Sequence, residues 1–236
     1  MRSKLGVVAF LATLAASGLA AAVADAPVSP KVTVKASVSP SKAGTAHHPQ
    51  SVTLKTKISW QLLGSAAQPI VQTFDILFPK GSLYNGAHLP SCSYSKLNAV
   101  GPAGCPKGSI VGSGTGNAYA DTTITHPKIT VVNGGASRVF FYTVLNNPAR
   151  VQSPVIGKIT KTSGKYAYAL HVTVPQVLQV VAGVPIELTF LSVTAGKGTW
   201  LETTGCGPGG HWPFSVSTGY NTGGSSKFTA SIACHK

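Results

Sequence analysis

Carboxylate side chains are scarce in this chain of 236 residues. The five that it contains are Asp25, Asp75, Asp121, Glu187 and Glu202. A glycosidase places two carboxyl groups on either side of one glycosidic bond, and Asp75 and Glu187 both lie in segments that alternate like β-strands. A glycosidase-like hydrolase that uses Glu187 or Asp75 is therefore one hypothesis. In a chain so poor in acids, we favour the alternative that these carboxylates pair with lysines.

Other motifs that could carry catalysis or hold a cofactor do not match. The segment 112–116 (GSGTG) places its serine outside the G-x-S-x-G frame of a hydrolase nucleophile, and no Lys-Ser or Lys-Thr completes a phosphate-binding loop. We interpret it as a strand or tight turn where backbones pack closely. A zinc site would need another kind of set, and the candidate ligands Cys206, His211, Cys234 and His235 lack the usual chelating spacing. We predict no catalytic residue, no metal and no cofactor.

A cluster of aromatic side chains near the C-terminus is a candidate binding site. The glycine-rich segment 207–210 leads into His211 and Trp212, and Trp200 and Tyr220 lie close by in the sequence. Aromatic side chains combine a large apolar face with a polar group, which suits them to binding surfaces. We therefore select Trp200, His211, Trp212 and Tyr220 as candidate residues for stacking on a sugar. The competing interpretation is that Trp212 is a buried plug at one end of the fold.

The four cysteines fall into two local pairs, Cys92 with Cys105 and Cys206 with Cys234. Three connectivities are possible in principle. We predict the sequential one, because each pair encloses a stretch rich in glycine and proline where few strand contacts would hold the ends. Closing a ring of about 15 residues contributes roughly 3 kcal/mol in the chain-entropy model, so each disulfide is expected to staple a loop.

The first 24 residues have the layout of a secretory signal peptide. Arg2 and Lys4 provide a positive start, residues 5–22 are an almost unbroken apolar run, and residues 22–24 (AVA) suit a signal peptidase. We predict that the mature chain begins at Asp25 and is secreted into an oxidising milieu, where it is extracellular, either free or associated with the cell surface. The alternative is a retained membrane anchor. After cleavage, no apolar run is long enough to span a bilayer.

The chain is strongly basic, with a formal net charge of +14 that falls to +12 when Arg2 and Lys4 leave with the signal peptide. Proteins that bind nucleic acid concentrate such charge in blocks or on one helix face. Here the lysines are spread singly, so we expect no nucleic-acid partner. The simplest interpretation is solubility with a weak, salt-sensitive attraction to anionic surfaces. The dispersed lysines include Lys31, Lys35, Lys42, Lys55, Lys57, Lys80, Lys96, Lys107 and Lys128.

Many short segments with alternating apolar residues, separated by turn signals, predict an all-β fold. We expect an antiparallel β-sandwich of about twelve short strands with two loop-stapling disulfides. The predicted strands are 32–38, 51–61, 70–78, 109–120, 128–132, 138–145, 154–160, 165–174, 186–195, 198–202, 214–218 and 227–234. The one helix candidate is 176–182. We divide the chain into a signal peptide (1–24), an N-terminal segment with the first strand (25–50) and the sandwich (51–236), and prefer one domain to a split near 146–154.

Turn and disulfide signatures surround the first pair of cysteines. The segment 89–92 (LPSC) is followed by 105–114 (CPKGSIVGSG), which gives the pattern P-x-C…C-P-x-G-S-x-V-G-x-G. This pattern resembles one in uncharacterised secreted β-rich proteins of high-GC Gram-positive bacteria, and segments 78–81 (FPKG) and 206–234 are similar to the same group. The resemblance spans residues 70–234. It implies an extracellular, β-rich protein and no particular activity, cofactor or catalytic residue.

These observations together predict a secreted, non-catalytic module that binds or supports structure at the bacterial cell envelope. Its expected partner is an anionic or carbohydrate polymer, met by the dispersed lysines and by the loop that carries Trp212. We do not expect an enzyme. The alternatives are the glycosidase-like hydrolase described above and a purely structural surface protein that associates with itself.

Overall fold

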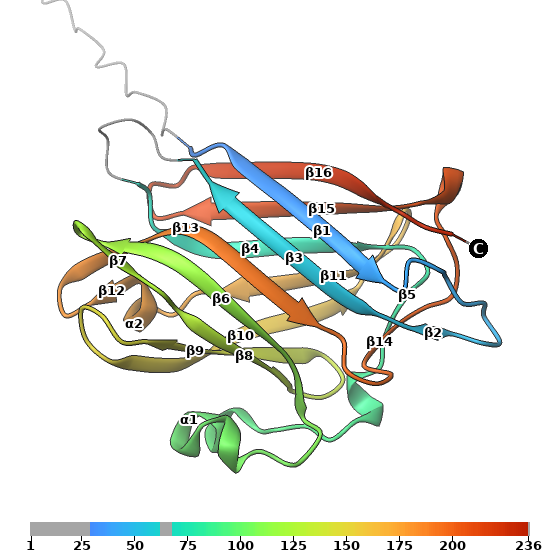
Figure 1. Ribbon diagram of the computed structural model, residues 1–236, viewed down its shortest axis with the longest axis horizontal. Coiled ribbons are helices and arrows are strands. Elements are labelled where there is room, and N and C mark those ends of the chain that lie inside the picture. Colours follow the sequence, from blue (N-terminus) through green and yellow to red (C-terminus); the bar gives the residue numbers. More distant parts are fainter. Residues whose placement is uncertain (1–28, 62–67, 236) are drawn as a thin grey trace, which may run out of the picture.

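The computed structural model describes residues 29–61 and 68–235, so the predicted signal peptide (1–24) lies outside the described residues. The described chain forms sixteen strands and two short helices, and neighbouring strands in both of its sheets are antiparallel (Figure 1). The prediction of an all-β antiparallel fold is confirmed. The number of strands exceeds the predicted twelve because several strands are only two or three residues long.

The elements follow one another along the chain with short connections. The strands are β1 (Val32–Ser39), β2 (Gln50–Ser51), β3 (Thr53–Trp60), β4 (Val71–Pro79), β5 (Ser82–Tyr84), β6 (Ile110–Ala120), β7 (Thr123–Thr125), β8 (Lys128–Asn133), β9 (Arg138–Leu145), β10 (Val151–Lys161), β11 (Tyr166–Thr173), β12 (Val180–Val181), β13 (Val184–Ala195), β14 (Leu201–Thr203), β15 (His211–Tyr220) and β16 (Ser225–Ala233). The helices are α1 (Tyr94–Val100) and α2 (Gln176–Gln179), with single 3-10 turns at Gly86–His88, Pro102–Gly104 and Pro208–Gly210.

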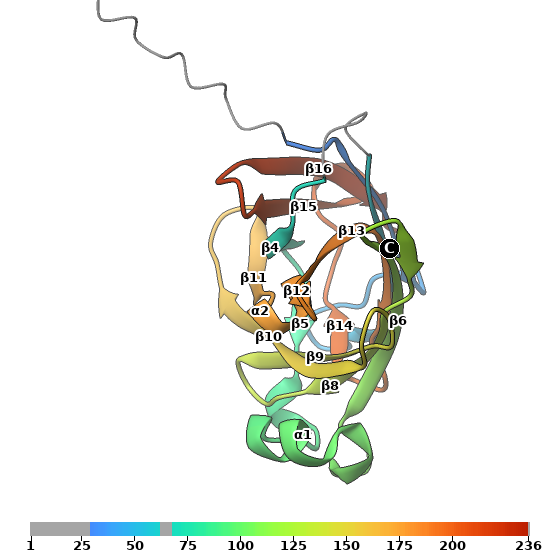
Figure 2. The ribbon, with the colours of Figure 1, turned by 90° about the vertical axis from the view of Figure 1, so that its left-hand side faces the viewer.

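One continuous sheet, rather than two packed sheets, forms most of the molecule. Its main path has eleven strands in the order β1-β3-β13-β6-β8-β9-β10-β11-β4-β15-β16. The two end strands come side by side: Ala43 N–H donates to the His235 carbonyl at 2.8 Å, and the Ser226 hydroxyl donates to the Pro30 carbonyl. The sheet thus curls into a nearly closed, barrel-like wall, as the view in Figure 2 shows. This corrects the predicted sandwich.

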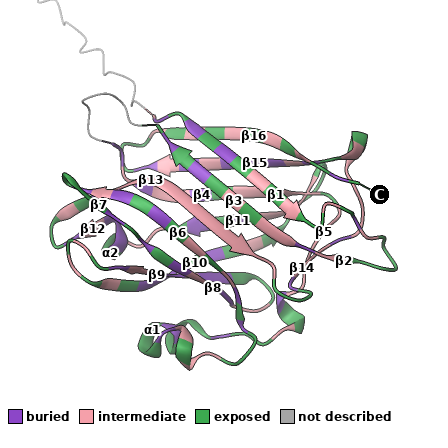
Figure 3. Ribbon diagram, in the orientation of Figure 1, coloured by how far each residue is buried: buried purple, intermediate pink, exposed green. Residues whose placement is uncertain are grey.

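Alternation along the strands assigns one face to the interior and one to the surface. In β1, the side chains of Val32 and Val34 are buried and those of Thr33 and Lys35 are exposed, and Figure 3 shows the same banding on β1 and β3. The GSGTG segment lies within β6, which confirms that it is a strand. A Cβ atom at Gly112 would collide with the Thr194 carbonyl oxygen of β13, so these backbones approach too closely for a side chain.

The two ends of the barrel-like wall are closed differently. At one end, Trp60 and Phe74 pack edge to face with ring centroids 5.8 Å apart. Leu178 of α2 and Ile186 of β13 are buried with them. At the other end, β2, β14 and β5 form a separate three-stranded sheet, in that order, which we call the cap. Between the two ends lies an apolar cavity of about 260 Å³.

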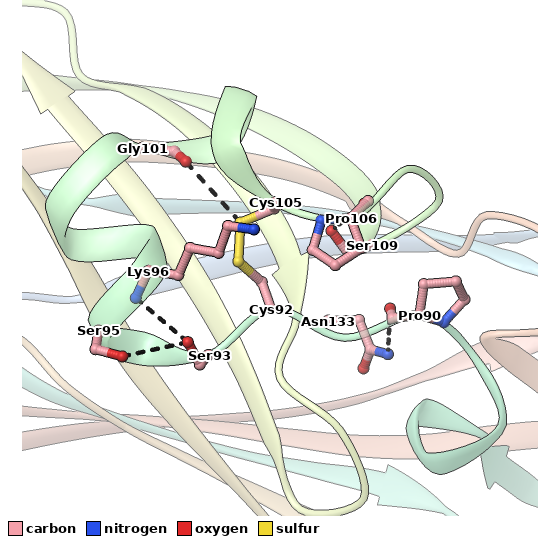
Figure 4. The surroundings of a disulfide bond; sticks show 10 residues. All are labelled: Pro90, Cys92, Ser93, Ser95, Lys96, Gly101, Cys105, Pro106, Ser109 and Asn133. Carbon is pink, nitrogen blue, oxygen red and sulfur yellow. Dashed lines mark hydrogen bonds between the residues drawn. A yellow bond between two sulfur atoms is a disulfide. The ribbon is translucent and has the colours of Figure 1, made fainter.

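Both predicted disulfides are present, and each holds a loop against the wall. Cys92–Cys105 encloses α1, and Cys206–Cys234 joins the segment after β14 to the end of β16. Figure 4 shows the first disulfide beside α1, whose N-terminal Lys96 N–H donates to the Ser93 side chain. Leu97 of α1 is fully buried against the outer face of β8 and β9. The sequence did not indicate this helix.

The buried Asn133 side chain at the end of β8 connects this loop to the wall and to the cap. Its amide Nδ2 donates to the carbonyls of Gly86 (2.9 Å) and Pro90 (3.0 Å), and the latter contact is visible in Figure 4. Its Oδ1 accepts from the Trp200 indole (3.2 Å) and from the Gly135 N–H (3.2 Å). A single buried amide therefore satisfies four polar groups from three separate segments.

Asn133→Leu tests this function of the amide. The substitution keeps a side chain of similar size but leaves the Trp200 N–H and two carbonyls without partners, so we expect a loss of roughly 1–3 kcal/mol in the free energy of unfolding. Urea unfolding measures this loss. Asn98→Leu, at an exposed asparagine of α1, is the matched control and should change stability by less than about 0.5 kcal/mol. Equal stability of the two variants would contradict the assignment.

Candidate functional site

The aromatic side chains selected from the sequence do not form a surface platform. Trp200, Trp212 and Tyr220 are 4%, 1% and 3% exposed, and of the four candidates only His211 is on the surface. Trp212 donates its indole N–H to the Gly205 carbonyl (2.9 Å) and packs against the Cys206–Cys234 disulfide. Trp212 is therefore a buried plug, as the competing interpretation of the sequence predicted.

The four candidates also lie at different places in the molecule. Trp200 and Trp212 line the interior near the cap, whereas the Tyr220 hydroxyl donates to Ser226 (3.1 Å) beside Pro30 at the opposite end. The expectation of sugar stacking assumed that proximity in sequence would bring these rings together at the surface. The strand β15 instead carries Trp212 and Tyr220 to opposite ends of the wall, so these residues cannot act as one surface site.

Tyr84 of β5 is the aromatic partner that the sequence analysis missed. Its ring packs edge to face on Trp200, with centroids 5.5 Å apart. Its hydroxyl donates toward the carbonyls of Gly135 (2.6 Å) and Arg138 (2.8 Å), which lie in and after the β8–β9 turn. Burial raises the pKa of Tyr84 to about 12, with a hydrogen bond involving Trp200 acting in the opposite direction. Tyr84 thus anchors the cap to the wall.

The carboxylate of Glu202 belongs to the cap and has neutral partners. Its Oε2 accepts from the Asn85 amide (2.7 Å) and its Oε1 from the Ser51 hydroxyl (3.2 Å). These bonds join β14 to β2 and to the segment after β5. The strand pairing of the cap places these hydroxyl and amide donors beside the carboxylate.

Glu187 and Asp75, the pair proposed for hydrolysis, are not neighbours. Glu187 is on β13 and Asp75 on β4, and several strands separate these two in either direction around the wall. Burial raises the pKa of Glu187, the Gln68 backbone N–H lowers it, and the charge of Asp121 raises it. The two carboxylates therefore cannot flank one glycosidic bond, which corrects the hypothesis based on a pair.

Asp75 pairs instead with a histidine on the neighbouring strand. Asp75 Oδ1 lies 2.6 Å from His171 Nδ1, and His171 Nε2 lies 3.3 Å from the Thr173 hydroxyl. A hydroxyl, a histidine and a carboxylate in series are also the elements of a nucleophilic triad. Here the His171 and Asp75 side chains are about half exposed (50% and 51%), on the open outer surface of β11 and β4. This position lacks the exclusion of water that makes such groups effective.

Three lysines gather on the outer face of β1 and β3. Lys35 is directly opposite Lys57 in the antiparallel ladder, and Lys55 is two residues from Lys57 on the same face. All three are exposed, and we call them the lysine patch. Lys31, just before β1, and Lys227, on the adjacent β16, are also exposed. Within residues 29–61 and 68–235, Asp75 pairs with His171 and no lysine is paired with a carboxylate.

The described residues contain neither a cluster of metal ligands nor a helix that could cross a membrane. In the part of the chain that the structure describes, no group of three or more potential metal ligands comes together. The sulfur atoms of Cys206 and Cys234 are joined in a disulfide, so the zinc alternative is excluded for them. Over the same residues, no helix combines the length and apolar character needed to cross a bilayer.

Comparison with known proteins provides no family for this chain. It matches no family profile, no curated protein and no solved structure.

The position of Tyr84 predicts how stability changes at high pH. Its pKa in the folded protein is about 12, against 10.0 for an unperturbed tyrosine, so the unfolded chain loses its proton first. The resulting stabilisation is complete below about pH 10 and is lost as pH rises toward about 12. Tyr84→Phe should be less stable at neutral pH, because it removes the hydroxyl bonds, but should lose less stability across this window. Urea unfolding at a series of pH values measures both effects.

Tyr94→Phe, at an exposed tyrosine of α1, is the matched control for this experiment. It is expected to keep the alkaline loss of the wild-type protein. If Tyr84→Phe also keeps that loss in full, the buried Tyr84 hydroxyl is not its source.

Proposed function

We propose that this protein is a secreted, non-catalytic binding module of the bacterial cell envelope that contacts an anionic polymer through the lysine patch. The observation that carries the proposal is the direct opposition of Lys35 and Lys57 on adjacent strands. Like charges opposite one another in a ladder destabilise the pair. A polyanion that lies across β1 and β3 would neutralise this repulsion.

The distribution of charge around the patch supports an anionic partner. Lys55 adds a third positive charge on the same face, and Lys31 and Lys227 extend it along the seam between β1 and β16. The four carboxylates in the described chain lie elsewhere: Asp75 on β4, Asp121 after β6, Glu187 at the start of β13 and Glu202 on the cap. The field above the patch is therefore positive, and salt would screen it over about 10 Å at 0.1 M ionic strength.

The two disulfides are consistent with an oxidising, extracellular compartment. A neutral carbohydrate is a weaker candidate partner than an anionic polymer, because the aromatic rings expected to stack on sugars are buried. The proposal accordingly assigns recognition to charge.

Binding to a poly(glycerol phosphate) resin tests the proposal. We expect the purified protein to bind at low ionic strength and to be released as salt is raised, with little binding to neutral dextran. A lysine close to an anionic surface contributes about 1 kcal/mol, so the double variant Lys35→Ser/Lys57→Ser should bind at least about tenfold more weakly.

The double variant Lys158→Ser/Lys161→Ser is the matched control. It removes the same charge from exposed positions of β10, a strand far from β1 and β3 in the sheet order. It should retain nearly wild-type affinity. Equal weakening by both double variants would show that only net charge matters. Binding that is insensitive to salt would contradict the proposal altogether.

A further inference from the structure

We propose that the interior of the barrel-like wall binds a single apolar molecule with an uncharged polar end, such as a medium-length alkyl alcohol. This site is separate from the lysine patch: its lining side chains point inward, whereas the lysines are on the outer face. The proposal therefore stands or falls independently of the anionic polymer.

The cavity is large for a protein interior. Its volume is about 260 Å³. Protein interiors normally contain few voids larger than a water molecule, and an engineered apolar cavity of roughly 150 Å³ stays dry and binds benzene. The present cavity is larger, so a molecule with more carbon atoms than benzene fits within it.

The wall itself explains why side chains do not fill this space. About eight strands enclose an interior that side chains just fill, whereas the main path here has eleven. In addition, β6 contributes glycine at three successive inward positions: Gly112, Gly114 and Gly116 are paired with Ala195, Val193 and Leu191 of β13. Val193 and Leu191 line the cavity, so their glycine partners share its face without adding a side chain.

The incomplete burial of some lining side chains also indicates that the interior is not filled. Large apolar residues of the interior, among them Ile76, Phe78, Phe141 and Leu188, are only partly buried although they face inward. At the Trp60 end, by contrast, Trp60, Phe74 and Ile186 are only 3%, 7% and 6% exposed. The interior is thus packed around Trp60 and unfilled beside these partly buried side chains.

The chemistry of the lining defines the class of ligand. Most lining residues are aliphatic or aromatic, and Glu202 of the cap is the one charged residue among the described residues that line the cavity. The apolar body of a ligand would supply the van der Waals contacts that the unfilled interior lacks. A carboxylate or phosphate end would be buried without a cationic partner, which is strongly unfavourable.

Most hydroxyl and carboxyl side chains of the lining belong to the cap, which sets the orientation, and the others include Thr56 of β3 and Thr143 of β9. Ser82, Tyr84, Glu202 and Thr203 come from β5 and β14. The Thr203 side chain is 5% exposed, and its hydroxyl has no hydrogen-bond partner in the described part of the chain. A ligand hydroxyl at this end would meet both donors and acceptors, while the apolar chain would extend toward the Trp60 end.

Titration of the purified protein with N-phenyl-1-naphthylamine, an uncharged apolar fluorescent dye, tests the proposal. We expect saturable binding of one dye per protein and displacement by 1-decanol, with decanoate at least about tenfold weaker as a competitor. Trp200 and Trp212 line the cavity, so their emission should be quenched as the dye binds. No saturable binding, or equal competition by decanol and decanoate, would overturn the proposal.

Two phenylalanine substitutions on one strand locate the site. Ala36 of β1 lines the cavity, and its exposed neighbour Ser37 faces outward. Ala36→Phe should reduce dye affinity at least tenfold by filling the interior, Ala36→Leu should reduce it less, and Ser37→Phe should leave it unchanged. Circular dichroism checks the fold of each variant, and Ala36→Leu serves if Ala36→Phe does not fold. Unchanged affinity in folded Ala36 variants would place the dye elsewhere and refute the interior site.

Discussion

The number of strands in the wall is the constraint on which the rest of the structure depends. Eleven strands on one continuous path enclose more space than their inward side chains can occupy. The result is an interior cavity, and two ends that need covering. Trp60, Phe74 and the residues of α2 cover one end by hydrophobic packing, whereas the cap and Trp212 cover the other.

Polar contacts hold the cap in place. Because these groups are buried, each of them needs a hydrogen-bond partner. Asn133, Tyr84 and Trp200 form a connected network in which a buried amide, a phenol and an indole satisfy one another and the surrounding backbone. Such groups stabilise a fold when all are partnered and destabilise it when one is removed. This network lies between the Cys92–Cys105 loop and the cavity, so it couples the position of the stapled loop to the closure of the interior.

The inner and outer faces of the wall offer two chemically distinct surfaces. The outside of β1 and β3 presents lysines without acidic partners, and the inside presents aliphatic and aromatic side chains with partial exposure. Alternation along each strand separates the two by a single residue, as with Lys35 and Ala36. A polyanion outside and an apolar molecule inside are therefore compatible proposals that do not compete for the same residues.

The sequence by itself determined the local features of this protein. Period-two alternation located β1, β4, β9, β11 and β13 nearly to the residue, because the alternation of side chains between two faces is a property of each strand alone. The pairing of the cysteines also followed from the sequence, because each pair closes a short loop. Helix α1 did not, since it is short and is held by the disulfide and by Leu97 against β9.

Only the tertiary structure decided which strands are neighbours, and with that the candidate sites. The wall closes where β16 meets β1, almost two hundred residues apart in the sequence, and β13 inserts between β3 and β6. The lysine patch exists because β1 pairs with β3 in one register, and the burial of Trp200 and Trp212 follows from the position of the cap. Long-range pairing depends on the sum of many weak contacts across the whole chain. The alternation within one segment therefore does not specify which other strand it pairs with.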